Sequence, residues 1–441
     1  MSVTTSYEIQ IYYVDYFGPQ TINFADRCTG FQIGQQTPVG TLGTGKAIIE
    51  LLNNDGELTP GGGGTYSNFD WFNVSLQIEA LVTGDDTSRA YLFHGIVTNI
   101  QFVDNGVNST VTLEARDGFS VGGRTPVDAD LAIPGSTYIF LSATETLESL
   151  YNGLTISGTE YIQRSIFPNL GDNNADPNIN FFRSSATSSQ EPQILDDLTN
   201  KTPNDIINNY VMPSMPGVAY PTLIERLSPV GIEYQGYVLE NDLTKRTGTA
   251  ANNMHTFAFA ENPSTGELPF TNMERRFNVE ELTNSAQLQL STSGSTVQES
   301  QDTASIAKYG ARNRSYTTTN QNDASAKDAA YRWSHRFSQA RFTPYTLEIT
   351  DRMVEKMADA DDDIWEDLID IRTGMWSVAT IEFTPTGAST PITETCVIVG
   401  RTFKATPSQM TLKLDLLPAQ DYQSFVLDSS TLGVLATNRL G

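Results

Sequence analysis

The chain is poor in basic residues for its 441 residues. It holds 27 lysines and arginines against 52 aspartates and glutamates, which gives a formal net charge of −25 at pH 7. This deficit of positive charge argues against a protein that coats DNA through phosphate contacts. It suits a surface that repels polyanions, although an acidic surface also serves solubility alone.

Cysteines and long apolar runs are also scarce. Cys28 and Cys396 are the only cysteines, and they lie far apart in the sequence. Two cysteines cannot stabilise a secreted fold of this size through disulfide bonds, so folding in a reducing cytoplasm is favoured. No apolar run approaches the roughly 18 residues of a membrane span. Residues 1–17 lack a basic region and an apolar core, so we expect no secretion signal.

Residues that commonly carry catalysis are few. The three histidines, His94, His255 and His335, lie in unrelated contexts without the spacing of a zinc site. No Gly-x-Ser-x-Gly elbow is present. Paired carboxylates for glycoside hydrolysis stay open, because 52 acidic residues make such pairs common. We predict no catalytic residue, no cofactor and no metal site.

One stretch comes close to a phosphate-binding loop. Gly40, Gly45 and Lys46 match Gly-x4-Gly-Lys, but Ala47 stands where Ser or Thr would hold Mg²⁺. A real loop of this kind follows a buried strand, and Pro38 is unsuited to a central strand. The sequence therefore argues against a nucleotide site.

An acidic run comes close to a calcium loop. It carries aspartates at positions 1, 3, 5, 9 and 12 of the calcium pattern, namely Asp359, Asp361, Asp363, Asp367 and Asp370. Ile364 stands where the sharp turn needs glycine, and position 12 is Asp rather than Glu. We interpret the run as a solvated acidic connector.

Composition and alternation favour a mainly β fold of the α+β type. Gly, Thr, Ser and Asn are abundant and aromatics make up 10%. Apolar and polar residues alternate in "SLQIEALV", "TVTLEARD" and "MTLKLDLL", as in strands with one buried face. Asn53 to Gly56 forms a turn after an apolar strand, and the glycines at 61–64 suggest a flexible loop.

Helices are expected in two regions. Ser142 and Glu145 form a capping box, and two short helices flank Pro203. A longer amphipathic helix is predicted from a stripe of apolar residues, capped by Asp323: Ala326, Ala330, Trp333, Phe337 and Ala340. The surrounding segment 301–345 carries seven basic and three acidic residues, either as a solvated helix face or as a patch for an acidic neighbour.

Residues 90–117 and 395–416 share a layout of strand, internal glycine, strand, turn and alternating strand. Two copies of one small β-barrel would explain this echo. A coincidence between ordinary β-meanders would explain it as well.

Several motifs in order resemble the tail hub proteins of long-tailed phages, also called baseplate hub or minor tail proteins. They are "AIIELLNNDGELTP" followed by "VSLQIEALV", "LFHGIVTNIQF" with "VTLEARDGFSVGGR", "DTASIAKYGARNRSY", and "FVLDSSTLGVLATNRLG". Asp117 and Arg439 occupy matched positions, but the family gives them no chemistry that we can assign. Residues 126–230 match least.

The resemblance implies a virion protein of the tail tip or baseplate, assembled in the host cytoplasm. Such hubs are homotrimers whose subunits carry two tail-tube-like β-barrels and two smaller domains. Six barrels would then dock a sixfold tail tube onto threefold tip proteins. Partners would be the distal tail or tail tube protein, the tape-measure protein, and tip or fibre proteins. DNA would only pass through the channel.

On this basis we divide the chain into four segments. Residues 1–125 would form an N-terminal tube-like β-barrel, and residues 126–230 a mixed α/β insertion. Residues 231–355 would form a β-rich domain with the amphipathic helix, and residues 356–441 a C-terminal β-barrel.

Two alternatives stay open. The first is a distal tail adaptor, a sibling role in the same machine. The second is a carbohydrate-binding or glycan-degrading tail-tip protein whose four tryptophans form a stacking platform. These tryptophans are Trp71, Trp333, Trp365 and Trp376.

Overall fold

A computed structural model describes most of the chain outside its middle third. Described are residues 4–15, 18–36, 43–67, 69, 71, 74–83, 87–104, 108–117, 255–277, 281–290, 296–318, 323–357, 362–371 and 373–422, with short pieces between 138 and 240. Among the helices in these residues, none is long and apolar enough to cross a membrane.

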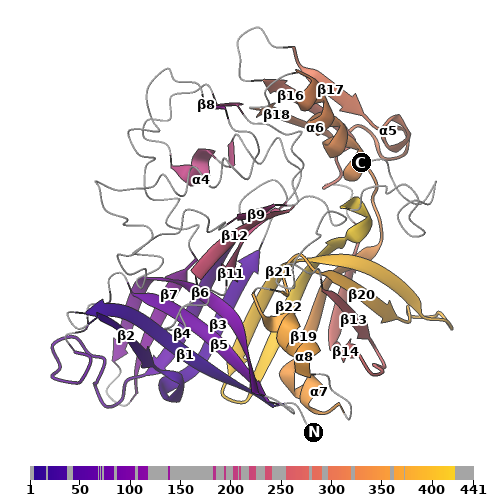
Figure 1. Ribbon diagram of the computed structural model, residues 1–441. Coiled ribbons are helices and arrows are strands. Elements are labelled where there is room, and N and C mark those ends of the chain that lie inside the picture. Colours follow the sequence, from indigo (N-terminus) through magenta and orange to yellow (C-terminus); the bar gives the residue numbers. More distant parts are fainter. Residues whose placement is uncertain are drawn as a thin grey trace.

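A 14-stranded sheet dominates the described structure, and its first half comes from the N-terminal quarter of the chain (indigo and purple in Figure 1). We call this part the first half-sheet. Its order is β3-β4-β7-β6-β5-β1-β2, and all its neighbouring strands are antiparallel. The strands are β1 (Thr4–Asp15), β2 (Gly18–Asn23), β3 (Cys28–Gln36), β4 (Thr44–Leu52), β5 (Ser75–Thr83), β6 (Thr87–Asp104) and β7 (Ser109–Arg116).

The second half-sheet lies beside the first and comes from the C-terminal part of the chain (Figure 1). Its order is β15-β19-β22-β21-β20-β13-β14, and antiparallel pairing of β21 with β3 joins it to the first half-sheet. Its strands are β13 (Thr256–Ala260), β14 (Glu267–Pro269), β15 (Asn272–Arg276), β19 (Thr343–Thr350), β20 (Val378–Phe383), β21 (Ile392–Thr406) and β22 (Gln409–Pro418).

Five strands follow the same path in both half-sheets. The orders β3-β4-β7-β6-β5 and β15-β19-β22-β21-β20 correspond strand for strand in chain order, and every neighbouring pair is antiparallel. The echo between residues 90–117 and 395–416 falls on β6–β7 and β21–β22, which are equivalent in this path. The repeat ends there, because β1 runs antiparallel to β5 whereas β13 runs parallel to β20.

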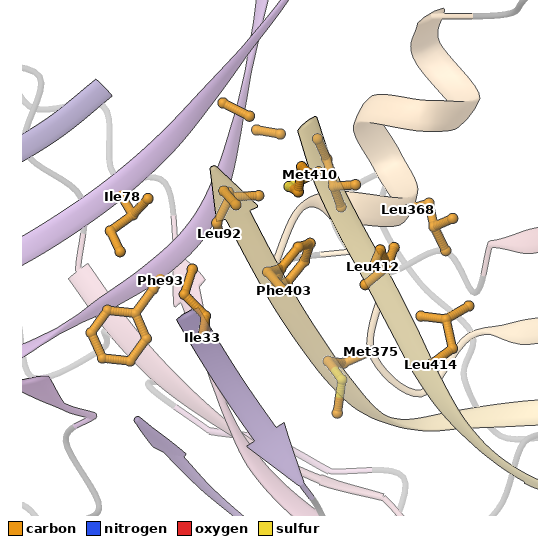
Figure 2. Close-up of a cluster of buried hydrophobic side chains, with 14 of the residues drawn as sticks. Ile33, Ile78, Leu92, Phe93, Leu368, Met375, Phe403, Met410, Leu412 and Leu414 are labelled. Atoms are coloured by element: carbon orange, nitrogen blue, oxygen red, sulfur yellow. The ribbon is translucent and has the colours of Figure 1, made fainter. Parts of the chain in front are cut away.

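The period-two patterns explain which face of each strand is buried. In β4 the side chains of Ala47, Ile49 and Leu51 are fully buried, while the residues between them are partly or fully exposed. Strands β7 and β22 alternate in the same way. Residues of both half-sheets belong to one apolar cluster, and Figure 2 shows Ile33 and Phe93 of the first half-sheet in this cluster together with Phe403 of the second. The two half-sheets therefore share a core.

A small module is inserted between β15 and β19. It consists of the sheet β17-β16-β18 with α5 (Thr303–Tyr309) and α6 (Asp323–Arg336), where the strands are β16 (Ser285–Leu290), β17 (Gln298–Gln301) and β18 (Asn313–Thr318). The predicted amphipathic helix is confirmed as α6, but it ends at Arg336, before the predicted stripe residues Phe337 and Ala340. Its Ala326, Ala330 and Trp333 are fully buried against β16.

The remaining described elements are short. They are η1 (Ala25–Arg27), β8 (Tyr138–Ile139), β9 (Phe182–Ser184), β10 (Gln193–Ile194), α4 (Pro203–Ile206), β11 (Val218–Ile224), β12 (Tyr234–Glu240), α7 (Asp351–Glu355), α8 (Asp362–Ile369) and η6 (Ala419–Asp421). The predicted capping box at Ser142 and the C-terminal motif with Arg439 lie outside the described residues.

The predicted mainly β fold class is confirmed. The division into four segments stays a prediction. The second half-sheet draws β13–β15 and β19 from the predicted segment 231–355 and β20–β22 from the predicted segment 356–441. The first half-sheet lies within residues 1–125.

Candidate assembly interface

The two half-sheets meet along one edge of the long strand β21. Residues Ile392 to Val397 of β21 pair with β20, and residues 400–405 pair with β3 along the same strand. A register shift between Ile398 and Gly400 separates the two stretches. Phe403 lies opposite Ile33, and both side chains are buried. Strand pairing between two repeated units is thus already present inside one chain.

A buried arginine strengthens this junction. Nη1 of Arg401 donates to the main-chain oxygens of Leu368, Ile369 and Asp370, over 3.4, 3.1 and 2.7 Å. Its Nη2 donates to Oε1 of Gln35 on β3 over 3.2 Å. A cation at the end of α8 satisfies carbonyls that the helix leaves without partners and complements the helix dipole.

The segment after α8 also binds the first half-sheet. A carboxylate oxygen of Asp370 accepts a hydrogen bond from the amide of Tyr91 on β6 over 3.0 Å, and the amide of Ile371 donates to the Tyr91 oxygen over 2.7 Å. On α8 itself, Trp365 is fully buried and donates to Thr5 Oγ1 on β1 over 3.3 Å.

Asp351 at the start of α7 makes a second polar link between the half-sheets. One of its carboxylate oxygens accepts from the Tyr7 hydroxyl over 3.1 Å and from the Met410 amide over 2.8 Å. Tyr7 belongs to β1 and Met410 to β22. These contacts and the shared core fix the orientation of one half-sheet relative to the other.

Two strand edges equivalent to this junction are unpaired within the described part of the chain. After its register shift, β6 pairs only with β7 over residues Asn99–Asp104, and β15 pairs only with β19. By the five-strand repeat, this part of β6 corresponds to the part of β21 that binds β3, and β15 corresponds to β3. Unpaired edges offer rows of main-chain donors and acceptors to another strand.

Exposed apolar side chains lie near both edges. Val103 on β6 is 42% exposed. Phe277, directly after β15, and Phe342, directly before β19, are 44% and 61% exposed. Their rings stack with centroids 5.3 Å apart, and the guanidinium of Arg275 lies 5.7 Å from the Phe342 centroid. Apolar surface of this kind commonly marks a protein contact.

The last two residues of the phosphate-loop motif lie inside a strand. Gly45 and Lys46 belong to β4, while Gly40 lies outside the described residues. Nζ of Lys46 forms an ion pair with Glu114 on β7 at 2.8 Å. The amide of Gly45 donates a hydrogen bond to the buried carboxylate of Asp117. Asp117, which matches a position of the tail hub motifs, therefore has a structural contact.

The acidic run is not the connector that we predicted from the sequence. Much of it forms helix α8, because apolar residues three and four positions apart face the core: Ile364, Trp365, Leu368 and Ile369. Asp367 pairs with Nδ1 of His255 at 3.1 Å. Asp359 and Asp361 lie outside the described residues. The described residues contain no group of three side chains that could together bind a metal ion.

The three histidines lie on separate elements. His94 is buried in β6, and desolvation lowers its pKa to about 4. His255 precedes β13. His335 lies near the end of α6, where its Nδ1 is 3.1 Å from the main-chain oxygen of Tyr331. This arrangement brings no two histidines together on one element.

The tryptophans do not form the exposed stacking platform of the carbohydrate alternative. Trp333, Trp365 and Trp376 are fully buried. Trp71 is partly buried against Phe24 and Phe69, with ring centroids 6.3 and 4.7 Å away.

The predicted turn after β4 is confirmed, whereas the glycine loop differs from the prediction. Gly56 adopts φ 73°, and its amide bonds to the Asn53 oxygen over 3.0 Å. The glycines at 61–64 form a hydrogen-bonded turn rather than an open loop, because Gly61 and Gly62 donate to the oxygens of Ser67 and Thr59.

Part of the basic segment 301–345 is engaged within its own module. Arg332 pairs with Asp328 at 3.0 Å, and the Arg314 guanidinium lies 4.5 Å from the Trp333 ring centroid. Lys308 and Lys327 are exposed.

Comparison with known proteins gives a match at the level of structure. No protein-family model matches the chain, and no curated protein sequence matches it. The crystal structure of a tail protein from Neisseria meningitidis MC58 matches over 95% of this chain and 98% of its own, with TM-score 0.52 and 11% identity. The 43 kDa tail protein of prophage MuSo2 from Shewanella oneidensis matches over 94% and 100%, with TM-score 0.51 and 10% identity.

The chain has the fold of these phage tail proteins. The fold that the sequence resemblance predicted is thereby confirmed. At 10–11% identity the likeness concerns the fold, and both coverages show that it extends over nearly the whole chain.

Proposed function

We propose that the chain is a structural hub subunit of a phage tail tip or baseplate. In this role it is a virion protein without enzymatic activity, and its mechanism is the docking of rings of different symmetry. The observation that carries the proposal is the five-strand repeat, whose two copies are joined by strand pairing and share one apolar core. The shared fold with tail proteins supports the same role.

The repeat gives a reason for the trimer. Three chains with two equivalent units each would present six similar units to a sixfold tail tube. The parts that differ between the two units, such as the module between β15 and β19, would keep a threefold arrangement toward tip proteins. Partners on the two sides would be the tail tube or distal tail protein and the tape-measure, tip or fibre proteins.

The acidic charge of the chain fits a ring through which DNA passes. A net charge of −25 per subunit repels the phosphate backbone, so DNA would slide without adhering. The repulsion falls off within about 10 Å at 0.1 M salt. The acidic residues that face the lumen would therefore matter most.

A gene deletion in the source phage tests the role. Negative-stain micrographs of the deletion phage should show no tails attached to heads. Expression of the chain in trans should restore the attached tails. Immunogold labelling should place the protein at the distal end of restored tails. Normal tails without the protein would contradict the proposal.

The distal tail adaptor remains the second candidate, because it belongs to the same machine and would also present β-units to the tube. The mass of the assembled protein separates the two, since the hub is expected as a trimer and the adaptor as a hexamer. The carbohydrate role loses its main support with the burial of Trp333, Trp365 and Trp376. A glycan array without binding would exclude it.

A further inference from the structure

The pairing of β3 with β21 serves as a template for a contact between two chains. At this junction β3 approaches β21 directly after the register shift and pairs over six residues, from Gly400 opposite Gln36 to Ala405 opposite Phe31. The strand β6 carries the same kind of shift, between Val97 and Asn99. The edge that follows it has no partner strand in the described structure, although its counterpart in β21 has one.

From this repeat we propose that β15 of one copy pairs antiparallel with residues Asn99–Asp104 of β6 in a neighbouring copy. The proposal rests on the proposed ring assembly and names the surfaces that build it. Each copy would donate β15 at one end and accept β15 on β6 at the other. The contact is therefore head to tail, and only a closed ring satisfies every edge.

The repeat also gives the register of this contact. Ala405 is the sixth residue after the shifted position Val399, and Asp104 is the sixth after Thr98. Phe31, which lies opposite Ala405, corresponds to Met273 on β15. Their partners Ile49 and Leu347 lie opposite Leu113 of β7 and Leu414 of β22, which occupy equivalent places in the repeat.

Met273 of one copy should therefore lie opposite Asp104 of the next, with Glu274 opposite Val103 and Arg275 opposite Phe102. The faces agree, because Glu274 and Val103 are both exposed, whereas Phe102 packs against the core and Arg275 is partly buried. A slip of one residue would place an apolar side chain opposite an exposed polar one.

The residues around the two strand edges support the proposal that another chain covers these edges. Val103 lies on the accepting edge, and the stacked rings of Phe277 and Phe342 lie at the end of the donated strand. Unpaired strands with apolar side chains promote uncontrolled aggregation unless another chain covers them. The register shift between Glu274 and Arg275 does not protect β15, because the extra residue at this point, Tyr345, belongs to β19.

Disulfide trapping in the full-length chain tests the pairing. In a Cys28→Ser background, the double variant Val103→Cys, Glu274→Cys places one thiol on each proposed edge, at positions that the repeat sets opposite each other. The matched control is Thr21→Cys, Glu274→Cys, because β2 also has an outer edge without a partner strand in the described residues. A disulfide forms only when the two Cα atoms lie within about 7 Å.

Oxidation at the concentration where the protein is oligomeric should link the first variant into multimers that end at the closed ring. These multimers should disappear on reduction, and the control should stay at single-chain mass on a non-reducing gel. Unlinked Val103→Cys, Glu274→Cys protein, whether oligomeric or monomeric in solution, overturns the pairing. Equal linking of the control overturns it as well.

This result is independent of the tail role. Failure of linking in a protein that still restores tails in the phage contradicts the strand contact and leaves the proposed function standing. Linking in a protein whose deletion leaves tails intact contradicts the function and leaves the contact standing.

Discussion

Nη1 of Arg401 lies 2.7 Å from the main-chain oxygen of Asp370, and both residues are buried where the two half-sheets meet. The same Asp370 accepts the Tyr91 amide of the first half-sheet through its carboxylate. A side chain of β21 is thereby connected to β6 through a single residue. This connection holds two repeated units in one orientation, which a ring of defined size requires.

Replacing Arg401 with methionine should destabilise the chain strongly. The change keeps an apolar stem but leaves the oxygens of Leu368, Ile369 and Asp370 without this donor. The Asp370 oxygen keeps the Gly374 amide as a donor over 2.9 Å. Each buried group without a partner costs about 1–3 kcal/mol, so for the other two oxygens the free energy of unfolding should fall by roughly 2–6 kcal/mol in urea titrations. The control Lys404→Met, exposed on the same strand, should change it by less than about 0.5 kcal/mol. Equal effects of both variants would contradict this account of the junction.

Glycines in the two long strands should differ in their tolerance of a methyl group. A Cβ at Gly95 would overlap the main-chain oxygen of Arg116, whereas a Cβ at Gly400 would meet the side-chain carboxylate of Asp415 at 2.5 Å. Backbone cannot move as a side chain can, so Gly95→Ala should lower the melting temperature more than Gly400→Ala. Overpacking costs about 1–3 kcal/mol. Gly34→Ala meets nothing within 4 Å and serves as the control; the reverse order of effects would count against this geometry.

Acid should destabilise the chain through His94. Burial lowers the pKa of His94 to about 4, whereas in the unfolded chain it lies near its usual 6.5. Between these values the unfolded chain binds the extra proton, so stability is complete above pH 6.5 and falls as the pH falls toward 4. The loss between pH 7 and pH 5 should be about 2 kcal/mol. Urea titrations of His94→Leu should lack this part of the pH dependence, and identical pH profiles would refute the assignment.

A lysine on the accepting edge should block assembly without unfolding the chain. Val103 is half-exposed at the open edge of β6, so Val103→Lys places a charge where a neighbouring strand would pair. Light scattering should show at least a tenfold weaker self-association, while the melting temperature changes little. Thr21→Lys, on the outer edge of β2, should associate like the unchanged protein. Normal association of Val103→Lys would speak against this edge as an interface.

The sequence predicted the parts of the fold that depend on local pattern. The alternation of apolar and polar residues identified the buried faces of β4, β7 and β22. The glycine inside each long strand indicated the repeat of residues 90–117 and 395–416. Turn chemistry located Gly56, and the apolar stripe located α6. These features are set by residues close together in the chain, so a single sequence carries them.

Features that depend on distant contacts could not be predicted in the same way. Arg401 follows an apolar run, and its burial depends on the end of α8 and on Gln35, which lies 366 residues away in sequence. The sequence does offer one signal that we missed. The apolar residues of α8 are spaced as in a helix, but the aspartates between them suggested a connector. The pairing of β3 with β21 depends on tertiary register, which alternation alone does not fix.

The mass of the assembled protein tests the central claim most directly. Multi-angle light scattering after size exclusion, alone and with the tail tube partner, gives the number of chains per particle. We expect three chains, since three copies of two joined units complete a ring of six. A particle of six chains would contradict the hub in favour of the distal tail adaptor. A single chain at every concentration, with and without the partner, would contradict ring formation altogether.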